Sequence, residues 1–474
     1  MEGRPPQFSY WLHGTITLVA NGTAEQPIFI VAAGDGEAIF DGAGCHNLFN
    51  VRSADHLHFE GLTIRNTAIA FFGGFQGERG GGVKGLTVRD CWIEGVVYGI
   101  LAQDGRSEDF TFTDNVILGR NPPDRLGAFG RTQAGYAVNI AGQGHTVAHN
   151  YVAHFWDGIN VFTSSLADPA YGQQSRAIDF HDNDLHNCVD QFIEADGGYA
   201  NIRILRNRGF NCPSQPLSTQ PVHAGPVYWI RNVIWNAAGG KMTMKNNNGA
   251  QVFVFLHNTS ATHLKMPPNI GQKPEQGTWL IQNNLSIGPR TPGGDRVTFV
   301  ERQWNPQTGR ADLPVPPSVV VELCDGVAGP SHIVDHNAYT AGISGDVWLV
   351  GGKRFPSLDA LRAATCYERN SLLVDGYSVF AGAAEPPHAL RGSGFVLPRD
   401  VDLRLAPGSP PVDAGAVIPG VNDDFTGRAP DIGAYEFGQP LPQYGPRGAR
   451  LRERLRAMLG VGPERQAPER PSAP

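Results

Sequence analysis

An asparagine recurs at a nearly constant spacing along this chain, each time closing a short run of β-branched or aliphatic residues. Asn66 is followed 24 residues later by Asp90 in the same position, and 25 residues after that by Asn115. A fixed period of this length is the signature of a solenoid, because one such unit cannot bury its apolar face without stacking on its neighbours. The full set of stations is Asn66, Asp90, Asn115, Asn150, Asn183, Asn207, Asn232, Asn258, Asn283 and Asn337.

The runs that precede these stations alternate in polarity, as in Leu62-Thr63-Ile64-Arg65. Such alternation is typical of β-strands with one face turned inward, and no apolar period of 3.6 residues favours a helical solenoid. The sequence therefore predicts an all-β fold, a right-handed parallel β-helix of roughly ten or more coils. We expect each station to occupy a tight left-handed bend, with its amide bonded to the copies in the adjacent coils.

Composition agrees with a turn-rich globular solenoid. The chain has 474 residues, of which 59 are glycine, 36 are proline and 41% are hydrophobic. The net charge of −7 provides no basic field, so nucleic acid is not an expected partner. No apolar run is long enough to span a membrane, and the N-terminal stretch lacks the hydrophobic region of a secretory signal. We expect a monomer that binds a polysaccharide.

Changes in the regularity of the period predict the organisation of the chain. We expect the β-helix over 1–438, with regular coils over about 46–300 and looser coils and a closing segment over 301–438. Residues 439–474 form a Pro/Arg-rich tail. Within that tail Ala449–Leu459 is predicted to be a short basic helix, followed by disorder.

Three insertions break the period, at 119–134, 163–177 and 264–278, and a Pro-rich stretch at 209–226 replaces the strand expected there. Insertions in solenoids often emerge on the binding side, so these segments are expected to border a groove. Cys188 and Cys212 lie one period apart, and the spacing allows either two free thiols or a disulfide.

The coil segments FEGLTIRNTAIAF and GPVYWIRNVIWN, together with the closing SPPVDAG and DIGAYEF, carry a family resemblance. They resemble bacterial right-handed parallel β-helix repeat proteins of the pectate-lyase-like superfold, over roughly residues 15–437. The resemblance implies a carbohydrate-active protein that is secreted or periplasmic. This superfold hosts lyases, hydrolases, uronate epimerases and non-catalytic modules. The sequence shows neither a polygalacturonase-like pair of Asp-Asp and NTD motifs nor a pectate-lyase calcium signature, so the resemblance alone does not imply the reaction.

The chemically richest part of the predicted coils is a row of outward-facing polar residues on one strand. Aligning the inward aliphatic residues of three coils places one outward residue of each beside the next, and Asp196 follows two positions beyond the last. The aliphatic residues are Val138, Ile159 and Ile193, and the outward residues are Asn139, Asn160 and Glu194.

The period also extends this row to a lysine. Glu194 lies 13 residues before Asn207, and Lys245 lies 13 residues before Asn258. The two side chains are therefore predicted on one line, two coils apart, with Thr219 between them.

This row predicts a polysaccharide lyase that cleaves a uronate by β-elimination. The α-proton of a uronate becomes acidic once its carboxylate is neutralised by amides or by a cation such as Ca²⁺, and a base then removes it. The predicted catalytic residues are Lys245 as the base, Glu194, Asp196 and Asp157. The predicted calcium ligands are Glu194, Asp196 and Asp190. The predicted substrate-binding residues are Asn139, Asn160, Trp156, Tyr136 and Lys241, the aromatic ones because pyranose rings stack on aromatic faces.

Two other functions use the same residues. An inverting glycoside hydrolase needs two carboxyl groups about 6.5–9.5 Å apart, which Asp157 and Glu194, or Glu194 and Asp196, are placed to supply. A non-catalytic glycan-binding or structural β-helix would show the same rows but would tolerate the loss of Lys245 and Glu194, which then form only a solvated charge pair on a strand face.

Overall fold

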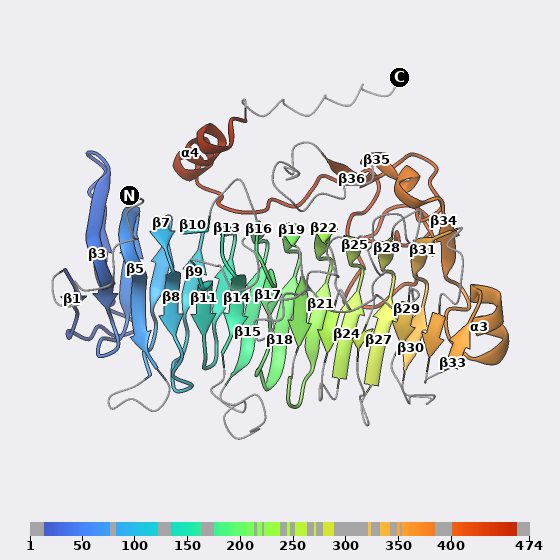
Figure 1. Ribbon diagram of the computed structural model, residues 1–474, viewed down its shortest axis with the longest axis horizontal. Coiled ribbons are helices and arrows are strands. Elements are labelled where there is room, and N and C mark those ends of the chain that lie inside the picture. The colour runs from blue at the N-terminus through green and yellow to red at the C-terminus, as the bar shows by residue number, and fades with distance from the viewer. Residues whose placement is uncertain are drawn as a thin grey trace, which may run out of the picture.

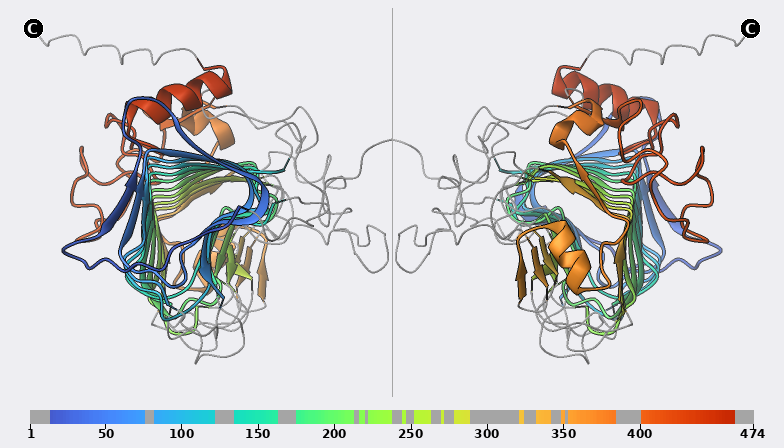
Figure 2. Two further views of the ribbon diagram at one scale, coloured as in Figure 1. Left: turned by 90° about the vertical axis from the view of Figure 1, so that its left-hand side faces the viewer. Right: turned by 90° about the vertical axis from the view of Figure 1, so that its right-hand side faces the viewer.

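The computed structural model describes residues 14–75, 82–121, 134–162, 175–212, 216–219, 222–237, 244–246, 252–262, 270–271, 278–288, 321–323, 332–341, 348–350, 353–383 and 401–461. The chain is an all-β parallel β-helix, as predicted. Successive coils stack along one axis (Figure 1), and three sheets surround a common interior (Figure 2). Eleven strands of one sheet are described, which agrees with the expected number of coils.

In chain order, each coil contributes a strand to a first, a second and a third sheet. The first sheet is the eleven-stranded one, and its strands pair in parallel from coil to coil. Its members are β2 (Ile28–Val31), β4 (Leu57–Glu60), β6 (Thr87–Arg89), β9 (Thr111–Thr113), β12 (Thr146–Ala148), β15 (Arg176–His181), β18 (Ala200–Leu205), β21 (Val227–Ile230), β24 (Val252–Leu256), β27 (Thr278–Gln282) and β30 (Ile333–Asp335).

The second and third sheets meet at the first coils. There the long strands β3 (Ala38–Asn50) and β5 (Leu62–Gly74) run through the corner and belong to both sheets, and β1 (Ile16–Thr17) pairs with β3. The second sheet continues through β7 (Trp92–Val96), β10 (Val116–Gly119), β13 (Tyr151–Ala153), β16 (Asp184–His186), β19 (Arg208–Cys212), β22 (Val233–Ala237), β25 (Thr259–Thr262), β28 (Leu285–Ile287), β31 (Ala338–Thr340) and β34 (Leu372–Val374). The third sheet continues through β8 (Tyr98–Ala102), β11 (Tyr136–Ile140), β14 (Asp157–Val161), β17 (Ile193–Glu194), β20 (Leu217–Thr219), β23 (Met244–Asn246), β26 (Ile270–Gly271), β29 (Val321–Leu323) and β32 (Trp348–Val350).

The remaining described elements lie after the regular coils. β33 (Lys353–Phe355) pairs antiparallel with β32 and is followed by α3 (Leu358–Ala364). Next come the 3-10 turn η1 (Gly376–Val379) and the antiparallel pair β35 (Phe380–Gly382) and β36 (Asp402–Leu405). The helix α4 spans Ala449–Leu459, the same range as the expected helix.

The repeating asparagine forms a ladder at the corner between the first and second sheets. The Asn207 amide donates to Asn232 Oδ1 at 3.1 Å, and Asn232 in turn donates to Asn258 Oδ1 at 3.0 Å. The members of the ladder are Asn115, Asn150, Asn183, Asn207, Asn232, Asn258, Asn284 and Asn337. Each rung satisfies a buried amide on both sides of a coil boundary, so the ladder fixes the stacking distance.

The ladder corrects two sequence-based expectations. The left-handed residue at each corner is the one before the asparagine, for example His149 with φ 54° before Asn150. Three predicted stations, Asn66, Asp90 and Asn283, have φ 55°, 49° and 60°, so they are corner residues rather than rungs. An Asn or Asp tolerates the left-handed conformation, which explains why they were mistaken for the ladder amide one position later.

The C-terminal segment 411–461, which we call the strap, runs back along the second sheet toward the first coils (Figure 1). It contacts the corner residues of successive coils: Arg447 bonds Asp114 at 2.8 and 2.6 Å, and Arg231 bonds Asp424 at 2.9 and 3.2 Å. Leu451 of α4 is fully buried in a cluster with Trp92 and other residues of the second sheet. Residues of the tail beyond 461, where disorder was predicted, lie outside the described part.

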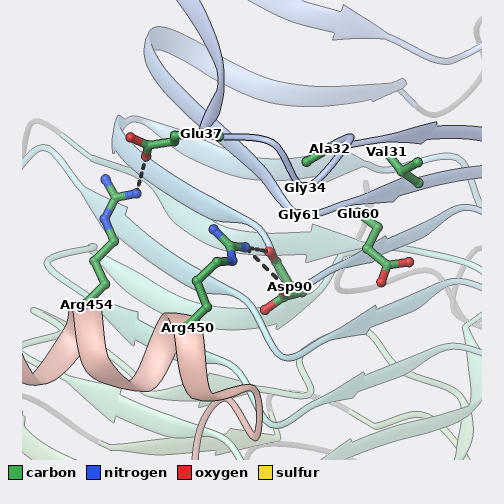
Figure 3. A pocket seen from close by; sticks show the side chains of 10 residues that line it. Val31, Ala32, Gly34, Glu37, Glu60, Gly61, Asp90, Arg450 and Arg454 are labelled. Atoms are coloured by element: carbon green, nitrogen blue, oxygen red, sulfur yellow. Dashed lines mark hydrogen bonds and ion pairs between the residues drawn. The ribbon is translucent and has the colours of Figure 1, made fainter.

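The end of the strap covers the first coils across a cavity of about 760 Å³ (Figure 3). Arg454 is bonded to Glu37 and Arg450 to Asp90 on the two sides of this cavity. Since both guanidinium groups are already paired with carboxylates, the cavity offers no unpaired cation from these two residues to an anionic ligand.

Candidate active site

The predicted alignment of the third sheet is confirmed by its strand register. The inward aliphatic residues pair from coil to coil and lie in the main core, so the residues after them face outward in one row. The inward residues are Val138, Ile159 and Ile193, and the row consists of Asn139, Asn160 and Glu194.

The row reaches the predicted lysine. Glu194 pairs with Ser218, and Ser218 pairs with Lys245. The intermediate residue is Ser218 rather than the expected Thr219, because this coil has one more residue between strand and ladder than its neighbours. For Lys245 only the backbone is described, and Lys241 lies outside the described residues.

The row is not solvent-exposed, as the sequence-based reading assumed. Exposed fractions are 1% for Asn139, 5% for Asn160 and 9% for Glu194, and Asp196 is 8% exposed. Outward residues of the first sheet in the same coils, such as Asp179, keep partial exposure. The interior of a β-helix therefore does not account for this burial, since these residues point away from it.

Four carboxylates gather in the coils of β14 and β17: Asp157, Asp190, Glu194 and Asp196. Each of them accepts a hydrogen bond from a neutral group. The Asn160 amide donates to Glu194, the Ser218 hydroxyl donates to Asp196 Oδ1 at 2.5 Å, and Gln191 donates from its side chain to Asp190 at 2.8 Å and from its backbone to Asp157 at 2.7 Å. Gln191 and Ser218 were missed at the sequence level, because a Gln in a turn and a Ser in a strand carry no pattern of their own.

Asp157 has the most perturbed carboxyl group of the four. Its burial, followed by the charges of Glu194, Asp190 and Asp196, raises its pKa well above the usual range. The position of Asp157 depends on close packing of the backbone at the next residue, Gly158. A Cβ on Gly158 would lie 2.4 Å from the carbonyl oxygen of Phe192. The absence of a side chain at Gly158 lets β14 approach the turn that supplies the Gln191 amide.

Two tyrosines continue the site toward the N-terminal coils. The rings of Tyr136 and Tyr98 stack with centroids 6.1 Å apart and an interplanar angle of 23°. Burial raises the pKa of Tyr136, and the neighbouring Asp157 and Glu194 raise it further, so the phenol keeps its proton. Trp156 is half-buried, and its carbonyl accepts from the amides of Val189 and Asp190.

Three buried side-chain oxygens beside the carboxylates have no hydrogen-bond partner among the described residues: Asn139 Oδ1, Asn160 Oδ1 and Gln191 Oε1. A buried acceptor without a donor costs about 1–3 kcal/mol. Native structures keep such groups mainly where a ligand, ion or water completes them.

The donor set around the row fits a calcium ion chemically, because Ca²⁺ prefers carboxylate and amide oxygens. The four carboxylates do not, however, form a group of three whose ligand atoms lie within 4.8 Å of one another. In the described part of the chain only His149, His181 and Asp182 do so. That group lies at the corners of the coils, where Arg206 already holds both oxygens of Asp182 at 2.9 Å. Cys188 and Cys212 are both buried and are not joined by a disulfide.

Comparisons with known proteins give little beyond this. No family model and no curated protein matches the chain. Among solved structures, the chain is similar to the crystal structure of pectate lyase Pel9A, with 14% identity and a TM-score of 0.37, over 89% of this chain and 82% of that one. No helix in the described residues is long and apolar enough to cross a membrane.

Proposed function

We propose that the chain is a carbohydrate-active enzyme that cleaves a uronate-containing polysaccharide by β-elimination at the row of the third sheet. The observation that carries the proposal is the register Glu194–Ser218–Lys245 beside Asp157, Asp190 and Asp196. In this register the backbone of Lys245 lies one strand spacing from Ser218 and two from Glu194, about 10 Å along the coil axis.

In this proposal Lys245 accepts the α-proton of the uronate, a role that requires its amine to be neutral when it acts. Glu194, Asp196 and Asp190 are the residues that would hold Ca²⁺, and the bound ion would neutralise the substrate carboxylate and so acidify that proton. Asn139 and Asn160 direct their unpaired oxygens to substrate hydroxyls. Tyr136 and Trp156 bind the sugar ring, and Lys241 binds a substrate carboxylate. Asp157, whose pKa is raised by burial and its acidic neighbours, returns a proton to the departing oxygen in this proposal.

A second candidate is an inverting glycoside hydrolase, favoured by the raised pKa of Asp157 beside Glu194. A carboxyl group that keeps its proton beside a second carboxylate is typical of a general acid. Asp157 would then protonate the glycosidic oxygen, and Glu194 would activate a water.

The deciding experiment incubates the purified chain with polyuronates and with neutral glycans, in Ca²⁺ and in chelator. Unsaturated, ultraviolet-absorbing products that disappear with chelator support elimination. New reducing ends without that absorbance support the glycoside hydrolase instead of the lyase. If neither unsaturated products nor new reducing ends appear but the glycan binds, the protein is a non-catalytic glycan-binding module.

Variants assign the roles. Lys245→Ala is expected to lower kcat at least a thousandfold in the lyase mechanism, and the matched exposed-lysine control Lys353→Ala should retain full activity. Glu194→Gln is expected to abolish turnover, whereas Asp179→Asn, on the first sheet of the same coil region, should leave it unchanged. A lyase that keeps its rate without Lys245 would exclude that residue as the base.

A further inference from the structure

The third sheet buries its outward row, whereas the outward residues of the first sheet keep partial exposure. Ser218 and Thr219 of β20 have no exposed surface, and Asn139, Asn160 and Glu194 have 9% or less. On the first sheet, by contrast, the side chains of the outward ion pair Asp179–Arg203 are 26% and 39% exposed. A polysaccharide threading along an open groove needs a continuous accessible row on several coils. The row of the third sheet is closed to solvent over the coils from β11 to β20.

The buried row is also specialised for accepting hydrogen bonds. Asn139 Oδ1, Asn160 Oδ1 and Gln191 Oε1 lack partners among the described residues, and their residues are at least 95% buried. Sugar hydroxyl groups are donors, so one saccharide can satisfy several of these oxygens. The three oxygens come from β11, β14 and the turn before β17, which span two strand spacings, or about 10 Å. Only a short saccharide is needed to reach all of them.

We propose that this row binds the end of a glycan chain in an enclosed site, so that the protein acts on chain termini or short oligosaccharides rather than along the interior of a polymer. The inference rests on the proposed function for the kind of sugar, a uronate. It adds that cleavage takes place at the end of the glycan chain and not in its interior. Burial excludes neighbouring sugar units on the closed coils, and the unpaired acceptors select the hydroxyl-rich terminal unit.

The test uses the Glu194→Gln variant, which is expected to bind without turnover, and measures its affinity for uronate oligomers of increasing length by calorimetry. An enclosed site predicts that affinity reaches its full value with a short oligomer and changes less than about threefold with further length. The active enzyme should release one short product while the polymer's viscosity falls slowly. Affinity that grows about tenfold or more with each added pair of sugars, or a rapid loss of viscosity with products of mixed length, would overturn the inference.

A second variant separates binding from folding. Asn139→Ala removes one unpaired acceptor and is expected to weaken short-oligomer binding about tenfold, with a thermal midpoint equal to or above that of the parent. A lower midpoint with unchanged affinity would make Asn139 structural and would count against the proposal. Asp179→Asn serves as the control that leaves affinity unchanged.

The outcomes also distinguish this inference from the function on which it rests. Elimination with long mixed products retains the lyase and rejects the enclosed site. Length-independent binding without any cleavage rejects the lyase and retains the enclosed site as a binding function. If no uronate binds at all, both proposals fail.

Discussion

Two buried aspartates on neighbouring sheets of the β-helix show opposite electrostatics. Asp184, on the second sheet under the strap, is 7% exposed, and Asp157, on the third sheet, is 1% exposed. Burial alone raises the pKa of both. For Asp184 the charges of Arg208 and His186, at 2.6 and 2.8 Å, outweigh burial and bring its pKa far below the usual range. For Asp157 the neighbouring charges are carboxylates, which raise its pKa further.

The difference separates a structural face from a candidate catalytic one. On the second sheet the buried charge is neutralised by an arginine, and Arg208 also lies 4.7 Å over the ring of Tyr444 of the strap. On the third sheet like charges are held together, an arrangement that costs stability and is typical of sites that bind a cation or move a proton.

The largest expected effect comes from breaking the pair on the second sheet. Arg208→Ala leaves Asp184 buried without its main cation and should cost about 3–5 kcal/mol of unfolding free energy, measured by urea denaturation. The matched control Arg203→Ala, which removes a partly exposed pair with Asp179, should cost less than about 1 kcal/mol. If Arg208→Ala and Arg203→Ala lower the free energy of unfolding equally, the ion pair under the strap is no more important for stability than the partly exposed pair on the first sheet.

The next effect tests whether the strap belongs to the cooperative fold. Leu451→Ala opens a cavity beside Trp92, Val116 and Tyr151, and a buried leucine truncated in this way costs about 2–5 kcal/mol. Met458→Ala on the same helix, where the side chain is 43% exposed, is the control and should be nearly neutral. If calorimetry of Leu451→Ala shows an unchanged single transition, the strap contributes no stability.

The third prediction has the opposite sign. Asp157→Asn removes a group whose folded-state pKa is raised, so the unfolded chain loses this proton near pH 4 while the folded chain keeps it to higher pH. Stability therefore falls as the pH rises from about 4 through the folded-state pKa, and the variant should gain about 0.5–2 kcal/mol at neutral pH and nothing below pH 4. Thermal melts across pH 3–8 check this, and a destabilised variant at neutral pH would contradict the assignment. Its activity should be lost.

The smallest effect concerns an exposed pair between the strap and a corner residue. Arg447→Ala breaks the bond to Asp114, but the arginine side chain is 53% exposed, so the expected loss is below about 1 kcal/mol. The difference between parent and variant in urea denaturation should shrink further in high salt. A larger, salt-independent loss would show that Arg447 acts through packing.

Much of the fold could be read from the sequence because the repeat is local. The strand register at Asn139, Asn160 and Glu194 was predicted from alternation and spacing alone, and so was the helix at Ala449–Leu459. The ladder was displaced by one residue at Asn66, Asp90 and Asn283, because an Asn or Asp suits both the left-handed corner and the rung beside it. Thr219 was placed one residue beyond its true neighbour Ser218, because the coils are not of equal length.

The sequence by itself determined the parallel β-helix, its period, and the row that joins Glu194 to Lys245, because stacking repeats pair like residue with like. Only the tertiary structure decided which outward residues are buried, which carboxylates are neutralised and which are crowded together, and where the strap lies. Those properties depend on contacts between residues that are far apart in the chain, such as Arg447 with Asp114, 333 positions away. No local pattern encodes such a contact. In the site, likewise, the raised pKa of Asp157 comes from its burial and from carboxylates brought in by the next coil.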